Sequence, residues 1–121
     1  MSTIHNFAPG DFLIFQLEAG YGLLRVLDVE HVDGDEVWHV AAYRDLFLDP
    51  EMADAALDTP DRLGVEIPHA ALTNRAFEST QVARMGNVPL RKPELEGYES
   101  WKESKERTVH DRSIRLLLGL R

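Results

Sequence analysis

The stretch PGDFLIFQLEAGYGLLRVLDVEHVDGDEVWHVAAY, residues 9–43, decides the fold class of this chain. It holds three runs rich in β-branched and aromatic residues, at 12–17, 21–30 and 36–43, with short turn signals between them. Such runs are typical of strands. Asp33-Gly34 predicts a tight hairpin between the second and third runs, because this dipeptide tolerates the positive φ angles of such a turn. We therefore expect a three-stranded antiparallel meander.

Both faces of the second predicted strand carry apolar residues. Strict alternation divides it into two sets, Leu24, Val26, Asp28 and Glu30 against Leu23, Arg25, Leu27 and Val29. Since neither set is purely polar, we expect a sheet that is curved or covered on both faces.

Two helices are expected after the meander. The first covers 50–57, with Asp49 as its N-cap and Pro50 at the first helical position. The second runs roughly over 94–107 and carries an apolar stripe at i, i+3 and i+6. The stripe consists of Leu95, Tyr98 and Trp101.

The remaining segments give weaker patterns. Residues 65–72 resemble a strand, and Pro68 would place that strand at an edge of the sheet. The tail, 111–121, fits a helix slightly better than a strand. Residues 74–80 do not favour either element, and a turn followed by a short extended piece is expected over 85–90.

The charge distribution is strongly uneven. The chain has 121 residues, with 21 acidic against 13 basic residues and a net charge of −8. Residues 28–66 contain twelve acids but only Arg44 and Arg62 as bases. An acidic surface repels phosphate backbones and attracts basic partners, and no lysine precedes Lys92, so nucleic acid is not an expected partner.

Several function classes have no support in the composition. The absence of cysteine excludes disulfides, thiolate nucleophiles and cysteine-ligated zinc. No apolar run approaches the ~20 residues of a membrane-spanning helix, and the start lacks the pattern of a secretory signal. We therefore expect a cytoplasmic protein of one domain, 1–121, that does not interact with a membrane.

No catalytic or metal-binding motif is present. No two of the five histidines stand at i, i+4, and no serine lies in a Gly-x-Ser-x-Gly context. We expect no cofactor, no metal and no catalytic residue. His39 follows the alternation of a strand and is expected in or near the core. A small hydrolase or ligand-binding protein with a His/acid site around His39 or His69 is the alternative.

The run Phe7-x-Pro9-Gly10-Asp11-Phe12-x-Ile14-Phe15-x-Leu17, then Gly20-Tyr21-Gly22-x-x-Arg25-Val26-Leu27, opens a set of scattered pieces that covers about half the chain. These pieces resemble the immunity protein 26 family of bacterial polymorphic toxin systems. The similar pieces include residues 7–17, with Pro9-Gly10-Asp11 before an apolar strand that ends in Leu17, and residues 20–27, although Leu24 stands where the family often has glycine. Residues 43–47 and 86–90 resemble two later pieces. The resemblance implies a bent, SH3-like β-barrel and a non-catalytic protein that binds and neutralises a toxin.

We accordingly expect a mainly β fold, a small SH3-like antiparallel barrel with one or two peripheral helices; an α+β arrangement is the alternative. The expected function is a protein-binding module, an immunity-type inhibitor that docks an acidic surface onto a basic toxin or other basic partner. A homodimer is a further expectation, because the tail is rich in leucine. The candidate contact residues are Asp33, Asp35, Glu36, Asp45, Asp49 and Glu51, with Trp38 or Tyr43 as an aromatic anchor if exposed.

Overall fold

The computed structural model describes residues 6–119, in which five strands form one antiparallel sheet in the order β4-β3-β2-β1-β5. The strands are β1 (Asp11–Leu17), β2 (Gly20–Val32), β3 (Asp35–Tyr43), β4 (Val65–Thr73) and β5 (Val82–Asn87). The helices are α1 (Pro50–Ala56), α2 (Asn74–Thr80), α3 (Glu96–Glu103) and α4 (Ile114–Leu117), with 3₁₀ turns η1 (Pro60–Arg62) and η2 (Lys92–Leu95).

The predicted meander is confirmed. β1 pairs with β2 and β2 with β3, and the hairpin between the last two turns at Asp33 and Gly34, whose φ angles are 50° and 83°. β4 extends the meander as an edge strand, as Pro68 predicted. The fold is mainly β, but the sheet is not closed, so the predicted barrel is not confirmed.

The expected division of β2 into two faces is wrong after Val26. The pairing register with β3 shifts between Val26 and Asp28, so an extra residue bulges there and reverses the alternation. Val29 therefore packs with Val26 in one core, whereas Glu30 meets His39 on the opposite face.

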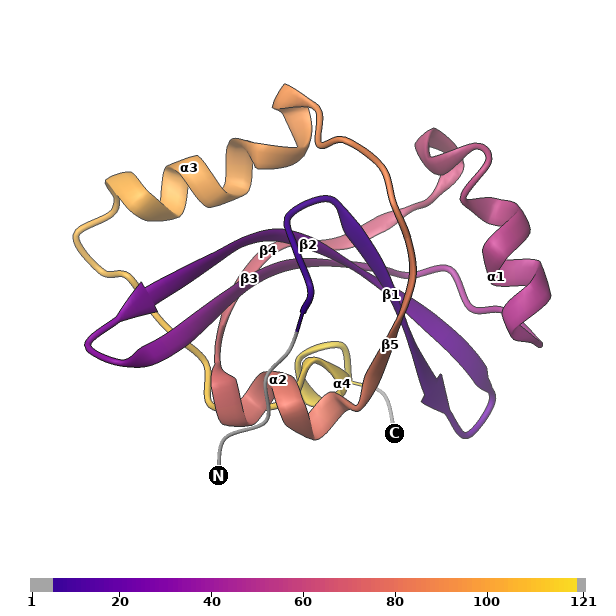
Figure 1. The fold of residues 1–121 in the computed structure, drawn as a ribbon, viewed down its shortest axis with the longest axis horizontal. Coiled ribbons are helices and arrows are strands. Elements are labelled where there is room, and N and C mark those ends of the chain that lie inside the picture. Colours follow the sequence, from indigo (N-terminus) through magenta and orange to yellow (C-terminus); the bar gives the residue numbers. More distant parts are fainter. Residues whose placement is uncertain (1–5, 120–121) are drawn as a thin grey trace.

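One face of the sheet is covered by α2 and α4, which lie below the sheet in Figure 1. The core on this face contains Trp38, fully buried and stacked on Phe77 of α2 with ring centroids 4.0 Å apart. Ile114 of α4 is also fully buried in this core. We call this apolar side the inner face.

The opposite face, which we call the outer face, is covered by α1 and α3 (Figure 1). Two small apolar clusters lie there, one around Phe12 and Ala53 of α1, the other around Leu27 and Tyr98 of α3. Arg25 and His39 are buried on this face as well, with exposed fractions of 1% and 0%. The expectation of a sheet covered on both faces is thus confirmed.

The later elements differ from expectation in detail. Residues 82–87, which were not expected as a strand, form β5 against β1. Residues 74–80 form α2, whose N-cap Thr73 accepts a hydrogen bond from the Ala76 amide. α3 ends at Glu103 rather than at 107, and the described part of the tail, 111–119, contains the short helix α4. Residues 120–121 of the predicted tail lie outside the described residues. Within residues 6–119, no helix combines the length and the apolar character needed to cross a membrane.

Candidate functional site

The predicted acidic contact residues lie in two separate groups. Asp33, Asp35 and Glu36 belong to the β2–β3 hairpin, whereas the other three follow the far end of β3. A nine-residue strand separates the groups by about 25 Å, at about 3.3 Å per residue. The second group consists of Asp45, Asp49 and Glu51. One small contact area cannot include both groups.

Neither predicted aromatic anchor is exposed. Trp38 is 0% exposed in the inner core, and Tyr43 is 6% exposed on the outer face. Burial raises the pKa of Tyr43 to about 12, so its hydroxyl is neutral. The condition under which these residues would contact a partner is therefore not met, because the alternation of β3 directs them into the two cores.

The segment around α1 presents apolar side chains to solvent. Leu48 is 78% exposed, Met52 49% and Leu46 46%. Exposed acids stand among them, and no basic residue occurs from 45 to 61. We call this region the α1 surface; its residues are Leu46, Leu48, Asp49, Glu51, Met52 and Asp54.

Two acids near α1 have structural roles. Asp49 is the N-cap, as predicted, and accepts a hydrogen bond of 2.8 Å from the Met52 amide. Asp45 accepts one of 2.6 Å from the Gly64 amide and so fixes the loop before α1 against the start of β4. Glu51 and Asp54 form no ion pair with another described residue, which leaves their charges available.

The hairpin acids line a groove of about 420 Å³. Val32 and Val37 supply its apolar part, and Arg75 of α2 lies on its other side. Arg75 is paired with Asp111. This groove is a second acidic region, but it already contains a cation of the chain.

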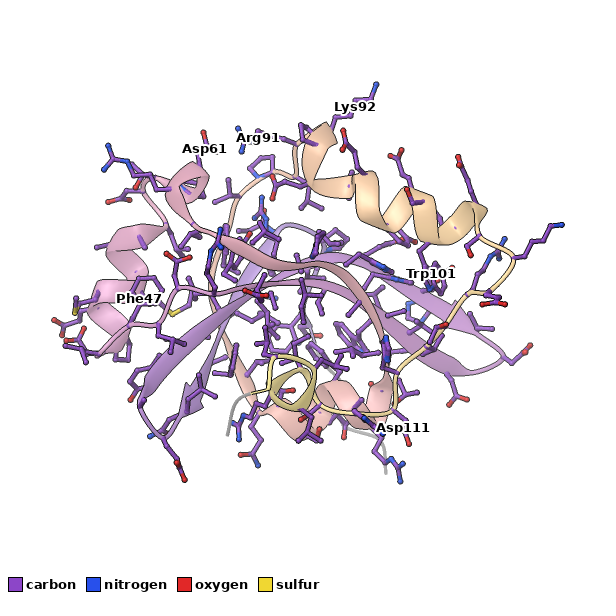
Figure 2. The ribbon with its side chains drawn as sticks, turned by 180° about the vertical axis from the view of Figure 1, so that it is seen from behind. Phe47, Asp61, Arg91, Lys92, Trp101 and Asp111 are labelled. Carbon is purple, nitrogen blue, oxygen red and sulfur yellow. The ribbon has the colours of Figure 1, made fainter. Side chains whose placement is uncertain are left out.

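A larger cleft of about 600 Å³ opens on the outer face, between η1 and the segment that leads into α3. Asp61 and Arg91 form an ion pair across it, and Figure 2 shows the two side chains facing each other. Its charged side chains balance, with three arginines and three carboxylates. These are Arg25, Arg62, Arg91, Asp58, Asp61 and Glu94.

Arg25 is the buried cation of this cleft. Its guanidinium donates to both carboxylate oxygens of Glu94, at 2.9 and 3.2 Å, and to the carbonyls of Gly10 and Pro89. It also lies 4.2 Å from the centre of the Phe12 ring. Burial raises the pKa of Glu94, but the hydrogen bonds from Arg25 and the Arg91 amide, together with the charges of both arginines, outweigh burial and hold that pKa below 4.5. The pair joins the sheet to the start of α3.

The third region is a buried histidine cluster beneath α3, made of Asp28, Glu30, His39, His69 and Tyr98. Nδ1 of His39 lies 2.9 Å from Nε2 of His69, and Nε2 of His39 lies 2.6 Å from a carboxylate oxygen of Glu30. The Tyr98 hydroxyl donates to Asp28 at 2.5 Å. Burial lowers the pKa of His39, and burial together with the charges of His39 and His110 lowers that of His69 to about 4.

This cluster brings together the two histidines of the hydrolase alternative. Both ring nitrogens of His39 are engaged, and neither histidine lines the 600 Å³ cleft. A general base needs a substrate proton within hydrogen-bond reach, and neither histidine lines the hairpin groove either. The hydrolase alternative stays a prediction without a substrate site.

Arg25 and Glu94 were missed as a pair, because 69 residues separate them in sequence. The available signal was an arginine inside the otherwise apolar run 23–27, since buried charges require partners. Within residues 6–119, no group of three His, Asp or Glu side chains is arranged to hold a metal ion.

Comparisons of the chain with protein-family models, curated proteins and solved structures gave no match.

Proposed function

We propose that this protein is a cytoplasmic binding module that docks its α1 surface onto a basic protein partner. The observation that carries the proposal is the exposure of Leu48, Met52 and Leu46 within a segment that contains only acidic charges. Large apolar side chains grouped at a surface are typical of protein contacts. The acids around them favour a partner of opposite charge.

Charge complementarity favours a basic partner over other occupants. Residues 45–61 carry six acids and no base, so a second copy of the chain would bring like charges together on this surface. Among the ion pairs within residues 6–119, Asp61 is the one acid of the six that pairs with an arginine, Arg91. A partner with Lys or Arg around a small apolar patch would satisfy both the charges and the exposed side chains.

The resemblance to the immunity protein 26 family supports one kind of partner. It implies that the basic protein is a toxin domain, which the module neutralises by binding rather than by chemistry. As part of the same proposal, we assign the sheet an SH3-like architecture.

The experiment compares capture by two charge-reversed variants with capture by the wild type. Glu51→Lys/Asp54→Lys alters the α1 surface, and Asp35→Lys/Glu36→Lys makes the same change of net charge at the hairpin. Each tagged protein is incubated with lysate of the source organism at low and high salt, and retained proteins are identified by mass spectrometry. We expect one basic protein that the wild type and the hairpin variant retain and the α1 variant binds at least about ten-fold more weakly.

Loss of capture in the hairpin variant alone would move the contact to the hairpin groove and contradict the proposal. Equal loss in both variants would indicate attraction by net charge only. To test neutralisation, the captured protein is expressed alone and together with the module. An immunity role predicts growth arrest in the first case and normal growth in the second.

A further inference from the structure

We propose that the His39–His69 pair is an acid-sensitive latch, which holds α3 on the outer face while it is neutral and releases α3 when it takes up protons. The inference rests on the packing of α3 and does not depend on the proposed function. It concerns a helix that lies on the same face as the α1 surface but at the other end of the sheet (Figure 1).

α3 packs on the imidazole rings of His39 and His69 in addition to a small apolar cluster around Leu27 and Ala41. The Tyr98 ring lies 4.3 Å from that of His39 and 5.6 Å from that of His69, measured between centroids. Trp101 contacts His39 edge-on at 4.7 Å. A Cβ added at Gly97 would lie 3.1 Å from the Cβ of His69, so the helix approaches β4 closely at this point. Any displacement of the rings therefore acts on α3 directly.

The neutral pair has one consistent arrangement of protons. The Glu30 carboxylate can only accept, so the single proton of neutral His39 is on Nε2. Nδ1 of His39 is then an acceptor, and Nε2 of His69 must donate to it across 2.9 Å. The three side chains form a continuous relay that leaves Nδ1 of His69 as the place where a first proton can bind.

Protonation disrupts this arrangement in two steps. One added proton places a charge on partly buried His69, beside fully buried His39, and burial penalises that charge. A second proton gives both histidines a donor at the shared contact, so two N–H groups would face each other where one hydrogen bond existed. Two positive charges would also lie side by side, and like charges at this separation disfavour each other.

The other charged groups around the pair do not reverse this outcome. From β2, Glu30 and Asp28 favour the charged form of His39, whereas Lys102 of α3 opposes it. His110, in the segment after α3, opposes the charging of His69, and Tyr98 remains a neutral donor to Asp28. The pKa of His39 remains below 6.5 because burial outweighs the attraction of Glu30 and Asp28, and the pKa of His69 is lowered by burial and by the charges of His39 and His110.

The sign of the pH effect follows from these directions. A released histidine titrates near 6.5, whereas docked His69 titrates at about 4, so the released state binds more protons between these values. The docked state is therefore at its most stable, relative to the released state, above pH 6.5, and this stability decreases as the pH falls toward 4. One pKa unit corresponds to a ten-fold change in population.

The test is amide hydrogen exchange of the full chain at pH 7.0 and pH 4.5, corrected for the intrinsic exchange rates. We expect protection of α3 to fall about ten-fold or more relative to α1, which serves as the reference within the molecule. In His69→Gln, which keeps a hydrogen-bonding group but cannot charge, the fall should be less than about three-fold. His31→Gln, an exposed histidine of the hairpin, is the matched control and should behave as the wild type.

Equal loss of protection in α1 and α3 would mean global acid unfolding and would overturn the latch. An unchanged response in His69→Gln would assign the loss of protection to groups other than His69 and would overturn the latch as well. If His69→Gln fails to dock α3 at pH 7.0, NMR titration of the wild type decides. Proton uptake by His39 and His69 must coincide with a shift of the Trp101 indole N–H, which donates to the Thr108 carbonyl, and uptake without that shift contradicts the proposal.

Discussion

The inner face of the sheet is packed with aromatic and aliphatic side chains, whereas the outer face contains a buried arginine and a buried histidine. Covering helices bury both faces, but different interactions hold the helices. α2 is held by the stacking of Phe77 on Trp38, and α3 by the polar contacts of Glu94 and Tyr98. Apolar burial is insensitive to pH, and paired charges are not, so the two faces should respond differently to mutation and to acid.

The largest effect is expected on the inner face. Phe77→Ala removes a 1% exposed ring that stacks on Trp38, and we expect a loss of about 3–5 kcal/mol in the free energy of unfolding. Urea denaturation at pH 7 measures it. Leu48→Ala is the control and should stay within about 0.5 kcal/mol, since that side chain is exposed. A loss below about 1 kcal/mol for Phe77→Ala would mean that α2 is not part of the main core.

Glu94→Gln tests the outer face and should cost about 2–3 kcal/mol. The substitution leaves the Arg25 charge buried without its carboxylate, although the carbonyls of Gly10 and Pro89 remain as acceptors. Glu96→Gln, an exposed acid two residues on, is the matched control. If both variants unfold at the same urea concentration as the wild type, the Arg25–Glu94 pair contributes nothing to stability.

The strands, the hairpin turn and the helix cap could be predicted, because the sequence signals for them are local. Runs of apolar residues, the Asp33-Gly34 turn and the Asp49 cap each lie within a few positions. The stripe of Leu95, Tyr98 and Trp101 was equally visible and packs as expected. The bulge after Val26 was not visible, because a register shift depends on the partner strand.

The polar pairs buried on the outer face could not be predicted, because their partners are distant in sequence. His39 and His69 are 30 residues apart, and Arg25 and Glu94 are 69 apart. Only pairing of β3 with β4, and the return of the chain over the sheet as α3, brings these groups together. The alternation of β3 places Trp38 and Tyr43 on opposite faces of the sheet. Because the strand is apolar on both sides, its sequence alone did not show that both side chains are buried.

The effect of Glu94→Gln should shrink in acid. The pKa of Glu94 is held below 4.5, so its ion pair stabilises the fold fully above that pH and is lost as the pH falls through the lower value. Gln resembles the protonated carboxyl and has no such dependence. We therefore expect the difference in unfolding free energy between wild type and variant to narrow from pH 7 to pH 3.5. Urea denaturation at both pH values measures this difference in unfolding free energy. If the difference stays constant, the shape of the Glu94 side chain rather than its charge makes the contact.

The smallest effect is expected where the same kind of ion pair is exposed. Asp61 and Arg91 face each other across the cleft with 68% and 62% of their side chains exposed, so water competes with the pair and salt screens it. Asp61→Asn should change the free energy of unfolding by no more than about 0.5 kcal/mol, as should the control Asp58→Asn. The Asp61–Arg91 and Glu94–Arg25 pairs both join a carboxylate to a guanidinium. Comparing their variants therefore isolates the effect of burial on the strength of the ion pair. If Asp61→Asn instead cost more than about 1 kcal/mol while Asp58→Asn did not, the pair would be coupling η1 to the segment before α3, and burial alone would not separate the two faces.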